Sequence, residues 1–248
     1  MSTFSQQWFQ GVCVGVHGVA AVTLLLATLD ESFFGTSGYV QIYIQSTDRV
    51  DMTPEKFHEW SMFALLSLFS FVTSCFHIYY FVNSNNNGDY YYDDAIRYNE
   101  YAITASIMFV VIALLTGIVD FYTLIAIFFL SFSTMMFGYI EEKTLSIRDY
   151  PYVLRPFFLG FVPYASAWAI LIIHFTRLYD IPPFVYIIFF GEIVLFSSFA
   201  LVSYIFVVKP GKLTEPKTMN GWYNVLSLTS KSLLVWVAFG GIINMENN

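Results

Sequence analysis

The sequence predicts an all-α membrane protein in which one domain, residues 1–248, folds as a bundle of seven membrane-spanning helices with a short β-hairpin in the first long loop. Three observations predict this class. Only 12% of the residues are charged and 57% are hydrophobic, whereas a typical soluble domain has about 25% charged residues. Seven apolar stretches are each long enough to cross about 30 Å of hydrocarbon. The loop after the first stretch contains a strand-like pattern.

The predicted helices lie near 8–29, 58–83, 91–116, 120–140, 152–176, 183–208 and 220–243. Only the first connection, 30–57, is long. Within it, residues 39–45 alternate with period two, which predicts a strand that belongs to a hairpin. Thr53, Pro54 and Glu55 resemble a helix start with proline at the first helical position, so we expect the second helix to begin there.

Composition also excludes several classes of protein. No basic stripe suggests nucleic-acid binding, and no removable signal peptide is recognisable. Cys13 and Cys75 both fall inside apolar stretches, so they predict no disulfide framework. We find no nucleophile and base paired as an intramembrane hydrolase would need, and we expect neither enzymatic activity nor a bound metal.

The basic residues predict the orientation, because cytoplasmic loops of membrane proteins carry an excess of Lys and Arg. Seven basic residues lie on the side of the amino terminus and three on the other side. The first set is Arg97, Lys143, Arg148, Arg155, Lys209, Lys212 and Lys217, and the second is Arg49, Lys56 and Arg177. We therefore expect a cytoplasmic amino terminus and an extracellular carboxyl terminus.

Lys231 lies near the middle of the last apolar stretch, about eleven residues from either membrane surface. A charged side chain at this depth costs roughly 2.5–3.5 kcal/mol on insertion scales. Such a lysine needs a partner, which can be a carboxylate, a water-filled cavity or a covalently bound carbonyl compound. A structural lysine paired inside the bundle is the alternative.

Glu100 is the first candidate partner for Lys231. It lies about nine residues inside the third helix from the cytoplasmic side, so the two side chains can meet at one level. Thr104 follows by four residues on the same face, and its hydroxyl could orient the carboxylate. A surface pair of Glu100 with Arg97 is the alternative.

Three further polar residues lie within the predicted helices. His17 and His77 fall in the cytoplasmic half, at a depth similar to that of Glu100, and predict a hydrated polar cluster. Glu192 enters the membrane from the opposite side and lies about nine residues deep. It could bond to hydroxyls of the last helix as a neutral acid, or it could belong to a proton path.

Ser227 precedes Lys231 by one turn and could bond to the nitrogen that Lys231 carries. Trp236 and Trp168 could form walls around a flat apolar ligand. Aromatic residues of membrane helices more often face lipid or pack against neighbours, so these two residues alone indicate little.

The sequence resembles the heliorhodopsins, which are retinal-binding seven-helix proteins of the microbial rhodopsin superfamily. The resemblance rests on the strings Ser227-Leu-Thr-Ser-Lys231-Ser-Leu-Leu-Val-Trp236, Glu100-Tyr-Ala-Ile-Thr104-Ala-Ser-Ile-Met108, Met135-Met136-Phe-Gly-Tyr139 and Gly191-Glu-Ile-Val-Leu-Phe196, and on the paired histidines His17 and His77. The long first loop that carries a strand and the cytoplasmic amino terminus are also similar.

The resemblance implies all-trans retinal bound covalently to Lys231 as a protonated Schiff base, with Glu100 as the counterion. It implies that Ser227 is a hydrogen-bond partner and that Met136 lies in the retinal pocket. It also implies a homodimer in the lipid bilayer, and a cytosolic signalling partner is possible.

The resemblance implies light sensing without transport as the leading function. A passive light-gated proton channel is the alternative, because Glu100 and Glu192 would lie on opposite sides of Lys231. A pump is disfavoured, since pumping rhodopsins carry a second carboxylate eleven residues after the counterion, where this chain has Val111. A non-photochemical transporter is a second alternative, although the sequence shows no internal repeat.

Overall fold

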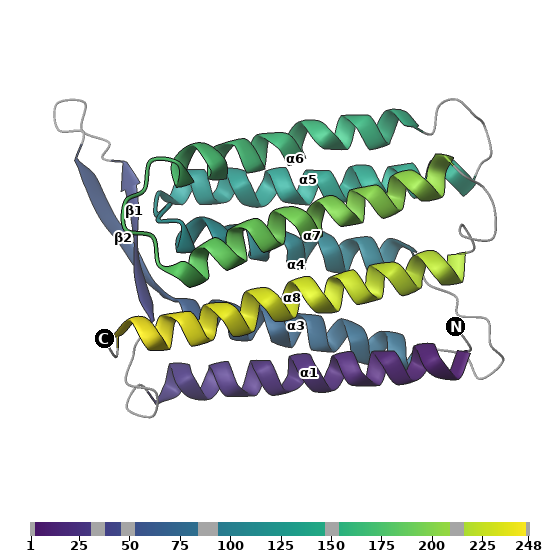
Figure 1. The fold of residues 1–248 in the computed structure, drawn as a ribbon, viewed down its shortest axis with the longest axis horizontal. Coiled ribbons are helices and arrows are strands. Elements are labelled where there is room, and N and C mark those ends of the chain that lie inside the picture. Colours follow the sequence, from purple (N-terminus) through teal and green to yellow (C-terminus); the bar gives the residue numbers. More distant parts are fainter. Residues whose placement is uncertain are drawn as a thin grey trace.

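The computed structural model describes residues 3–30, 38–45, 53–83, 94–146, 154–208 and 216–246. Within these ranges the chain forms seven long helices and two strands, and the helices lie side by side in one bundle (Figure 1). All seven helices are long and apolar enough to cross a membrane. The predicted fold class is therefore confirmed, including the two-stranded antiparallel sheet.

The helices are α1 (Thr3–Leu29), α3 (Met62–Asn83), α4 (Asp94–Leu115), α5 (Phe121–Ser146), α6 (Leu154–Phe175), α7 (Pro183–Val208) and α8 (Pro216–Glu246). The two ends of the chain lie at opposite ends of the bundle (Figure 1). α1 packs along α3, α4 along α5, α5 along α6, and α7 along α8, while contacts between α1 and α8 close the bundle.

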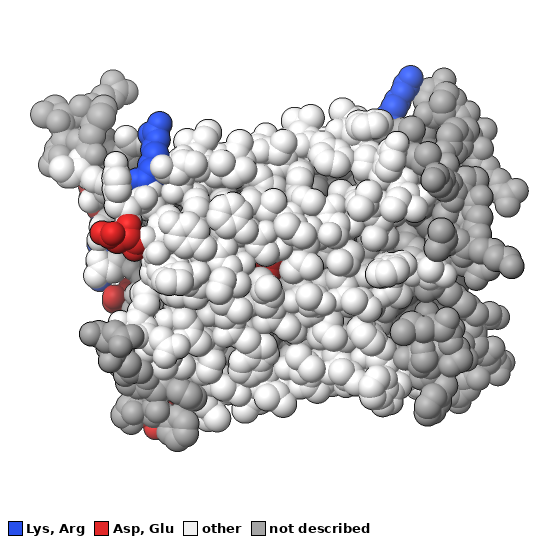
Figure 2. All heavy atoms as spheres, viewed as in Figure 1, with Lys and Arg blue, Asp and Glu red and all other residues white. Residues whose placement is uncertain are grey.

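The surface between the two ends of the bundle is suited to lipid. Figure 2 shows that the charged side chains visible on this face lie near its ends, and that the surface between them is uncharged apart from a small acidic area. Leu26, Phe71 and Ile187 are large apolar side chains that are each more than half exposed. Because such a surface is unfavourable in water, the protein is an integral, multi-pass membrane protein in a lipid bilayer.

The second strand corrects the prediction of where the second membrane helix begins. β2 (Pro54–Ser61) pairs antiparallel with β1 (Tyr39–Gln45), and α3 begins only at Met62. The prediction of a helix start at Thr53-Pro54-Glu55 is therefore wrong. Pro54 is instead the first residue of a strand, a position that tolerates the missing N–H of proline.

Main-chain hydrogen bonds fix the hairpin to the bundle. The N–H of Tyr43 donates to the carbonyl of Val119 at 2.9 Å, and the N–H of Met62 donates to the carbonyl of Gly38 at 2.9 Å. Gly38 has a φ of +53°, and a Cβ there would lie 3.2 Å from the ring of Phe63. Both the backbone conformation and the close approach of this ring therefore favour glycine.

The turn between α4 and α5 is tight because α4 ends in a Schellman motif. Gly117 has a φ of +81° and donates its N–H to the carbonyl of Leu114 at 3.0 Å, while Ile118 donates to Ala113 at 2.9 Å. The turn places α5 directly beside α4, the helix that carries Glu100.

Candidate functional site

A buried ion pair joins α4 and α8. Lys231 lies at the middle of α8, fifteen residues after Pro216 and fifteen before Glu246. Its Nζ lies 2.5 Å from Oε1 of Glu100, and the two side chains are only 4% and 2% exposed. The two groups that we expected at one depth are thus in direct contact.

The second carboxylate oxygen of Glu100 has a partner on α3. The hydroxyl of Tyr80 donates to Oε2 of Glu100 at 2.8 Å. Thr104 does not orient the carboxylate as the sequence suggested, because its hydroxyl donates to the main-chain carbonyl of Glu100 at 2.9 Å. Charge-assisted bonds from Lys231 and Tyr80 therefore hold both oxygens of Glu100.

Arg97 does not pair with Glu100. Its side chain is 1% exposed, forms an ion pair with Glu142 of α5 and donates a hydrogen bond to Asn220 of α8. The surface-pair alternative for Glu100 is thus ruled out, since both Arg97 and Glu100 are buried and have other partners. Arg97 is also an inward-facing residue and not one of the loop charges that predicted the orientation.

The two predicted histidines lie together between α1 and α3. The rings of His17 and His77 stack with centroids 5.7 Å apart and an angle of 9° between their planes. Nδ1 of His77 lies 2.5 Å from Oε1 of Gln10. The ring of His77 also packs edge-on against Tyr80, with centroids 5.8 Å apart. Because Tyr80 donates to Glu100, this histidine pair adjoins the ion pair.

Several buried polar atoms near the histidines lack a protein partner among the described residues. They are Nε2 of Gln10, His17 and His77, Oγ of Ser70 and Oγ1 of Thr73. Buried polar groups of this kind usually bond to ordered water. The region between α1 and α3 therefore contains polar atoms to which water or a proton could bind.

A small cavity of about 30 Å³ lies at Lys231. Ser227, Thr104 and Ser230 supply hydroxyl groups to its wall, and the other lining residues are Tyr101, Ala105, Met108, Met135, Phe196 and Phe199. The Nζ atom of Lys231 lies 5.7 Å from the centre of the Tyr101 ring. An amine beside a carboxylate at the end of an apolar, aromatic cavity fits covalent binding of a polyene aldehyde such as retinal.

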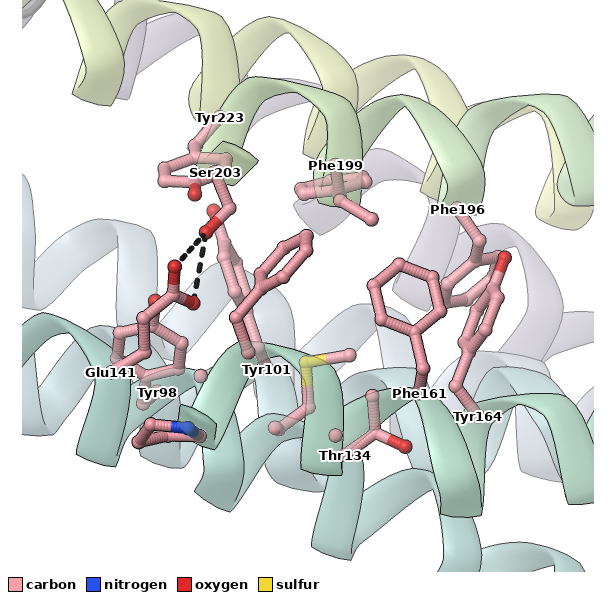
Figure 3. Close-up of a pocket in the computed structure, with 16 residues that line it drawn as sticks. Tyr98, Tyr101, Thr134, Glu141, Phe161, Tyr164, Phe196, Phe199, Ser203 and Tyr223 are labelled. Atoms are coloured by element: carbon pink, nitrogen blue, oxygen red, sulfur yellow. Dashed lines mark hydrogen bonds between the residues drawn. The ribbon is translucent and has the colours of Figure 1, made fainter. Parts of the chain in front are cut away.

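A larger cavity of about 110 Å³ adjoins the first and shares Tyr101, Met135, Phe196 and Phe199 with it. Figure 3 shows Phe161, Tyr164 and Phe196 at one end of this cavity, and Glu141, Ser203 and Tyr223 at the other. A polyene of the length of retinal needs more room than the two cavities provide separately. The four shared side chains lie where the two cavities meet, so retinal that filled both cavities would contact them.

A glycine keeps this larger cavity open at α5. A Cβ on Gly138 would lie 2.8 Å from the ring of Tyr98, which also lines the cavity. Because real Cβ atoms do not approach other atoms this closely, the close packing of α5 on Tyr98 requires glycine here.

Three aromatic or sulfur-containing candidates lie off the cavity walls. Trp236 is 39% exposed and contacts Phe239 instead. Trp168 lies behind the wall, where its ring packs on Phe196 with centroids 6.1 Å apart. The methionine that lines both cavities is Met135, not Met136. The sequence could not distinguish these positions, because the rotation of each helix depends on its neighbours.

Glu192 is completely buried on α7 and adjoins the site at Lys231. Its Oε2 accepts a hydrogen bond of 2.6 Å from Ser230, the residue that precedes Lys231. The expected bond to a hydroxyl of the last helix is therefore present. Its Oε1 has no partner among the described residues.

Sequence reasoning missed three residues that contact the site directly. Gln10 precedes His17 by seven residues and Tyr80 follows His77 by three, so helical spacing could have placed each on the face of its histidine. The acidic partner of Arg97, Glu142, lies on another helix, and no spacing in the sequence indicates that contact.

Comparison with solved structures shows the rhodopsin fold. The chain is similar to the crystal structure of Exiguobacterium sibiricum rhodopsin, with a TM-score of 0.69 and 13% identity over 98% of both chains. It is also similar to the crystal structure of the transmembrane domain and linker region of Salpingoeca rosetta rhodopsin phosphodiesterase. That match has a TM-score of 0.67 and 13% identity, and covers 97% of this chain and 72% of the other. A thermophilic rhodopsin gives a TM-score of 0.69 and 13% identity over 98% and 96% of the two chains.

No curated protein sequence matches the chain. A model of the heliorhodopsin family does match it, over residues 6–243. The match includes every residue of the site, from Gln10 on α1 to Lys231 on α8. The chain therefore belongs to the heliorhodopsin family and is a retinal-binding, light-sensing membrane protein.

Proposed function

We propose that this heliorhodopsin is a light sensor in which Lys231 holds all-trans retinal covalently as a protonated Schiff base, with Glu100 as its counterion. The observation that supports the proposal most directly is the contact of Lys231 with Glu100 at the wall of an aromatic cavity. Bound retinal supplies absorption of visible light and an isomerisation that moves the positive charge at Lys231.

Glu100 stabilises that charge in the dark. Its carboxylate lies within hydrogen-bonding distance of the Lys231 nitrogen, and Tyr80 holds the second oxygen so that the group cannot turn away. In a low-dielectric interior this pair is far stronger than it would be in water. Displacement of the nitrogen from Glu100 therefore favours transfer of its proton to the carboxylate.

The histidine pair offers the next site for that proton. Tyr80 contacts both Glu100 and His77, and His17 stacks on His77. Either ring can take up that proton on a free nitrogen, since Nε2 of His17 and Nε2 of His77 have no hydrogen-bond partner among the described residues. A proton that leaves Glu100 would then stay within the polar region between α1 and α3, as a sensing cycle without transport requires.

Passive, light-gated proton conduction is the second candidate function, and the position of Glu192 favours it. This carboxyl group reaches Ser230 beside Lys231 from the side opposite to the histidines. Towards the hairpin end, however, α7 and α8 present only buried apolar side chains within the described residues. They are Val185, Ile188, Phe189, Leu234, Val235, Ala238 and Ile242. A path through Glu192 would thus be closed in the dark and would need light to wet it.

We propose that the end of the bundle opposite the hairpin faces the cytoplasm. Arg97 is buried and therefore does not count among the loop charges. Six basic residues then remain on the side of the amino terminus, against three on the other side. Lys143 and Arg155 are exposed at that end, whereas Arg148, Lys209 and Lys212 lie outside the described residues. The homodimer that the resemblance implies stays a prediction, and so does an unknown cytosolic signalling partner.

Retinal attachment is tested by adding all-trans retinal to membranes that contain the protein. A visible absorption band should form with the wild type and should be absent from Lys231→Ala, which lacks the reactive amine. Lys143→Ala, which removes an exposed lysine, is the control and should keep the band. A colourless wild type, or covalent retinal on Lys231→Ala, would show that the proposal is wrong.

Glu100→Gln tests the counterion. Loss of the negative charge should lower the pH at which half of the pigment is protonated by about 1–3 units. The remaining protonated pigment should absorb at longer wavelength, and a spectrophotometric titration measures both effects. Glu59→Gln, on the exposed hairpin, should change neither. If Glu100→Gln titrates in the same way as the wild type, another acid must be the counterion, and Glu192 is the first to test.

Antibody labelling of tagged protein in intact cells tests the orientation. A tag at the carboxyl terminus should be accessible from outside, and a tag at the amino terminus should become accessible only after permeabilisation. The reverse pattern would place Glu100 and the histidines in the extracellular half and would overturn this part of the proposal.

Patch-clamp recording under illumination distinguishes sensing from conduction. A passive path should give a current that reverses with voltage and with the pH gradient, and Glu192→Gln should reduce it about tenfold or more because the relay loses a titratable group. Absence of photocurrent at every voltage would exclude proton conduction and leave light sensing as the function. A current that Glu192→Gln does not change would mean that protons follow another route.

A further inference from the structure

The larger cavity contains a third buried carboxyl group, Glu141, that takes no part in the ion pair or the histidine pair. It lies on α5 and is 2% exposed. Both of its carboxyl oxygens lie within hydrogen-bonding distance of the Ser203 hydroxyl on α7, at 3.1 and 3.0 Å (Figure 3). Among the described residues no cation lies within ion-pair distance of it. A carboxyl group in such surroundings is costly to ionise.

The neighbouring residue, Glu142, has a different role. It is partly exposed and forms an ion pair with Arg97, so its charge is balanced. Successive residues of a helix point about 100° apart, which lets Glu141 face the cavity while Glu142 faces the arginine. Only Glu141 is therefore available to hold an exchangeable proton inside the cavity.

Hydroxyl groups line the space between Glu141 and Lys231. Ser203 and Tyr223 lie beside Glu141, and Tyr101 lines both this cavity and the one at Lys231. Ser227 lines the second cavity. Tyr223, Ser227 and Lys231 recur at intervals of four residues and so share one face of α8. This row of hydroxyl groups is not a continuous hydrogen-bonded chain, because Oγ of Ser227 has no partner among the described residues. A proton passes along the row only when new hydrogen bonds form between its members.

The guanidinium of Arg97 lies behind this end of the cavity. Its Cζ lies 5.1 Å from the ring centre of Tyr98 and 5.2 Å from that of Tyr223, and both rings line the cavity. A negative charge formed on Glu141 would thus be separated from a buried cation by aromatic rings. That cation is already paired with Glu142, so it balances a negative charge on Glu141 only in part.

We infer that Glu141 is a proton donor to the nitrogen of Lys231 during the photocycle. The inference rests on the proposed retinal site at Lys231. After this nitrogen has lost its proton to Glu100, the O–H bond of Glu141 breaks and an N–H bond forms at Lys231, with the proton carried through the hydroxyl row. The Glu141 carboxylate then regains a proton from the end of the bundle at which Arg97 and Glu142 lie. At the end of the cycle the proton held by Glu100 and the histidine pair leaves at that same end, so no net charge crosses the membrane.

The groups that face Glu141 determine how this exchange depends on pH. They are Tyr98 on α4, Pro156 and Phe157 on α6, Ser203 on α7 and Tyr223 on α8, with the Arg97–Glu142 pair as the adjacent charges. Only Glu141 among the groups that line the cavity has a carboxyl side chain. Substitution at this one position should therefore remove the donor.

Flash photolysis of the retinal-loaded protein gives the first test. In Glu141→Gln the return of the proton to the Lys231 nitrogen should be about tenfold slower or more, because the donor must be replaced by protons from the bulk. Its rate should then increase in proportion to the proton concentration, whereas the wild-type rate should depend only weakly on pH. Glu59→Gln should behave as the wild type. Equal rates in wild type and Glu141→Gln would overturn the inference.

Infrared spectroscopy gives a second test that needs no photocycle. In the retinal-free protein near neutral pH, the difference between wild type and Glu141→Gln should contain a carboxylic-acid C=O band, and Ser203→Ala should shift this band because it removes the hydrogen bond. If Glu141→Gln folds poorly, the Ser203→Ala variant alone decides. Absence of the C=O band, or a band that Ser203→Ala does not shift, would overturn the inference. A wild type that never forms a pigment would instead overturn the proposed function, and the donor role with it.

Discussion

The ion pair of Lys231 with Glu100 constrains how the helices of this bundle pack. A charge left alone at the bilayer centre costs at least about 2.5–3.5 kcal/mol, and removal of one partner from a buried pair typically destabilises a protein by about 3–5 kcal/mol. α4 and α8 must therefore keep the register that brings the two groups to 2.5 Å. Tyr80 extends the constraint to α3, because its bond to Glu100 holds only if α3 is equally well placed. The site and the packing of three helices are thus determined together.

Polar groups are distributed unequally on the two sides of this ion pair. The histidine pair lies in the half of the bundle away from the hairpin. The ion pair of Arg97 with Glu142 lies there too, as does Glu141. In the hairpin half, the described parts of α7 and α8 beyond Glu192 bury only apolar side chains. A charge that moves at Lys231 would therefore meet several polar, hydratable groups on one side, and on the other side Glu192 followed by apolar side chains of α7 and α8. This asymmetry favours a proton that leaves and returns on the same side, as a sensor requires.

The sequence predicted the fold class because seven long apolar stretches leave few alternatives in a membrane. It also predicted that Lys231 and Glu100 share a level, since depth along a helix follows from residue number alone. The start of the second membrane helix was predicted wrongly because Pro54 suits both a first helical turn and the first position of a strand, and only pairing with β1 decides between them. Which side of a helix faces the site could not be predicted, as Met136 and Trp236 illustrate. Helix rotation depends on neighbouring side chains, and α5 and α8, which carry these two residues, have apolar residues on every side.

Under the proposed function, sensing and conduction would differ in whether the apolar side chains of α7 and α8 can be wetted, and we propose that aromatic packing controls that step. The rings of Phe175 on α6 and Phe189 on α7 stack at 4.1 Å, and Phe189 also contacts Trp168 at 5.9 Å. Trp168 packs on Phe196, which is a wall of both cavities. A ligand that turns Phe196 aside therefore acts on rings that close the space beyond Glu192. Because tightly packed rings shift between discrete arrangements and do not deform gradually, the same isomerisation can leave the path closed or open it. In this proposal the choice between the two functions would depend on how far this aromatic cluster repacks, and not on the ion pair itself.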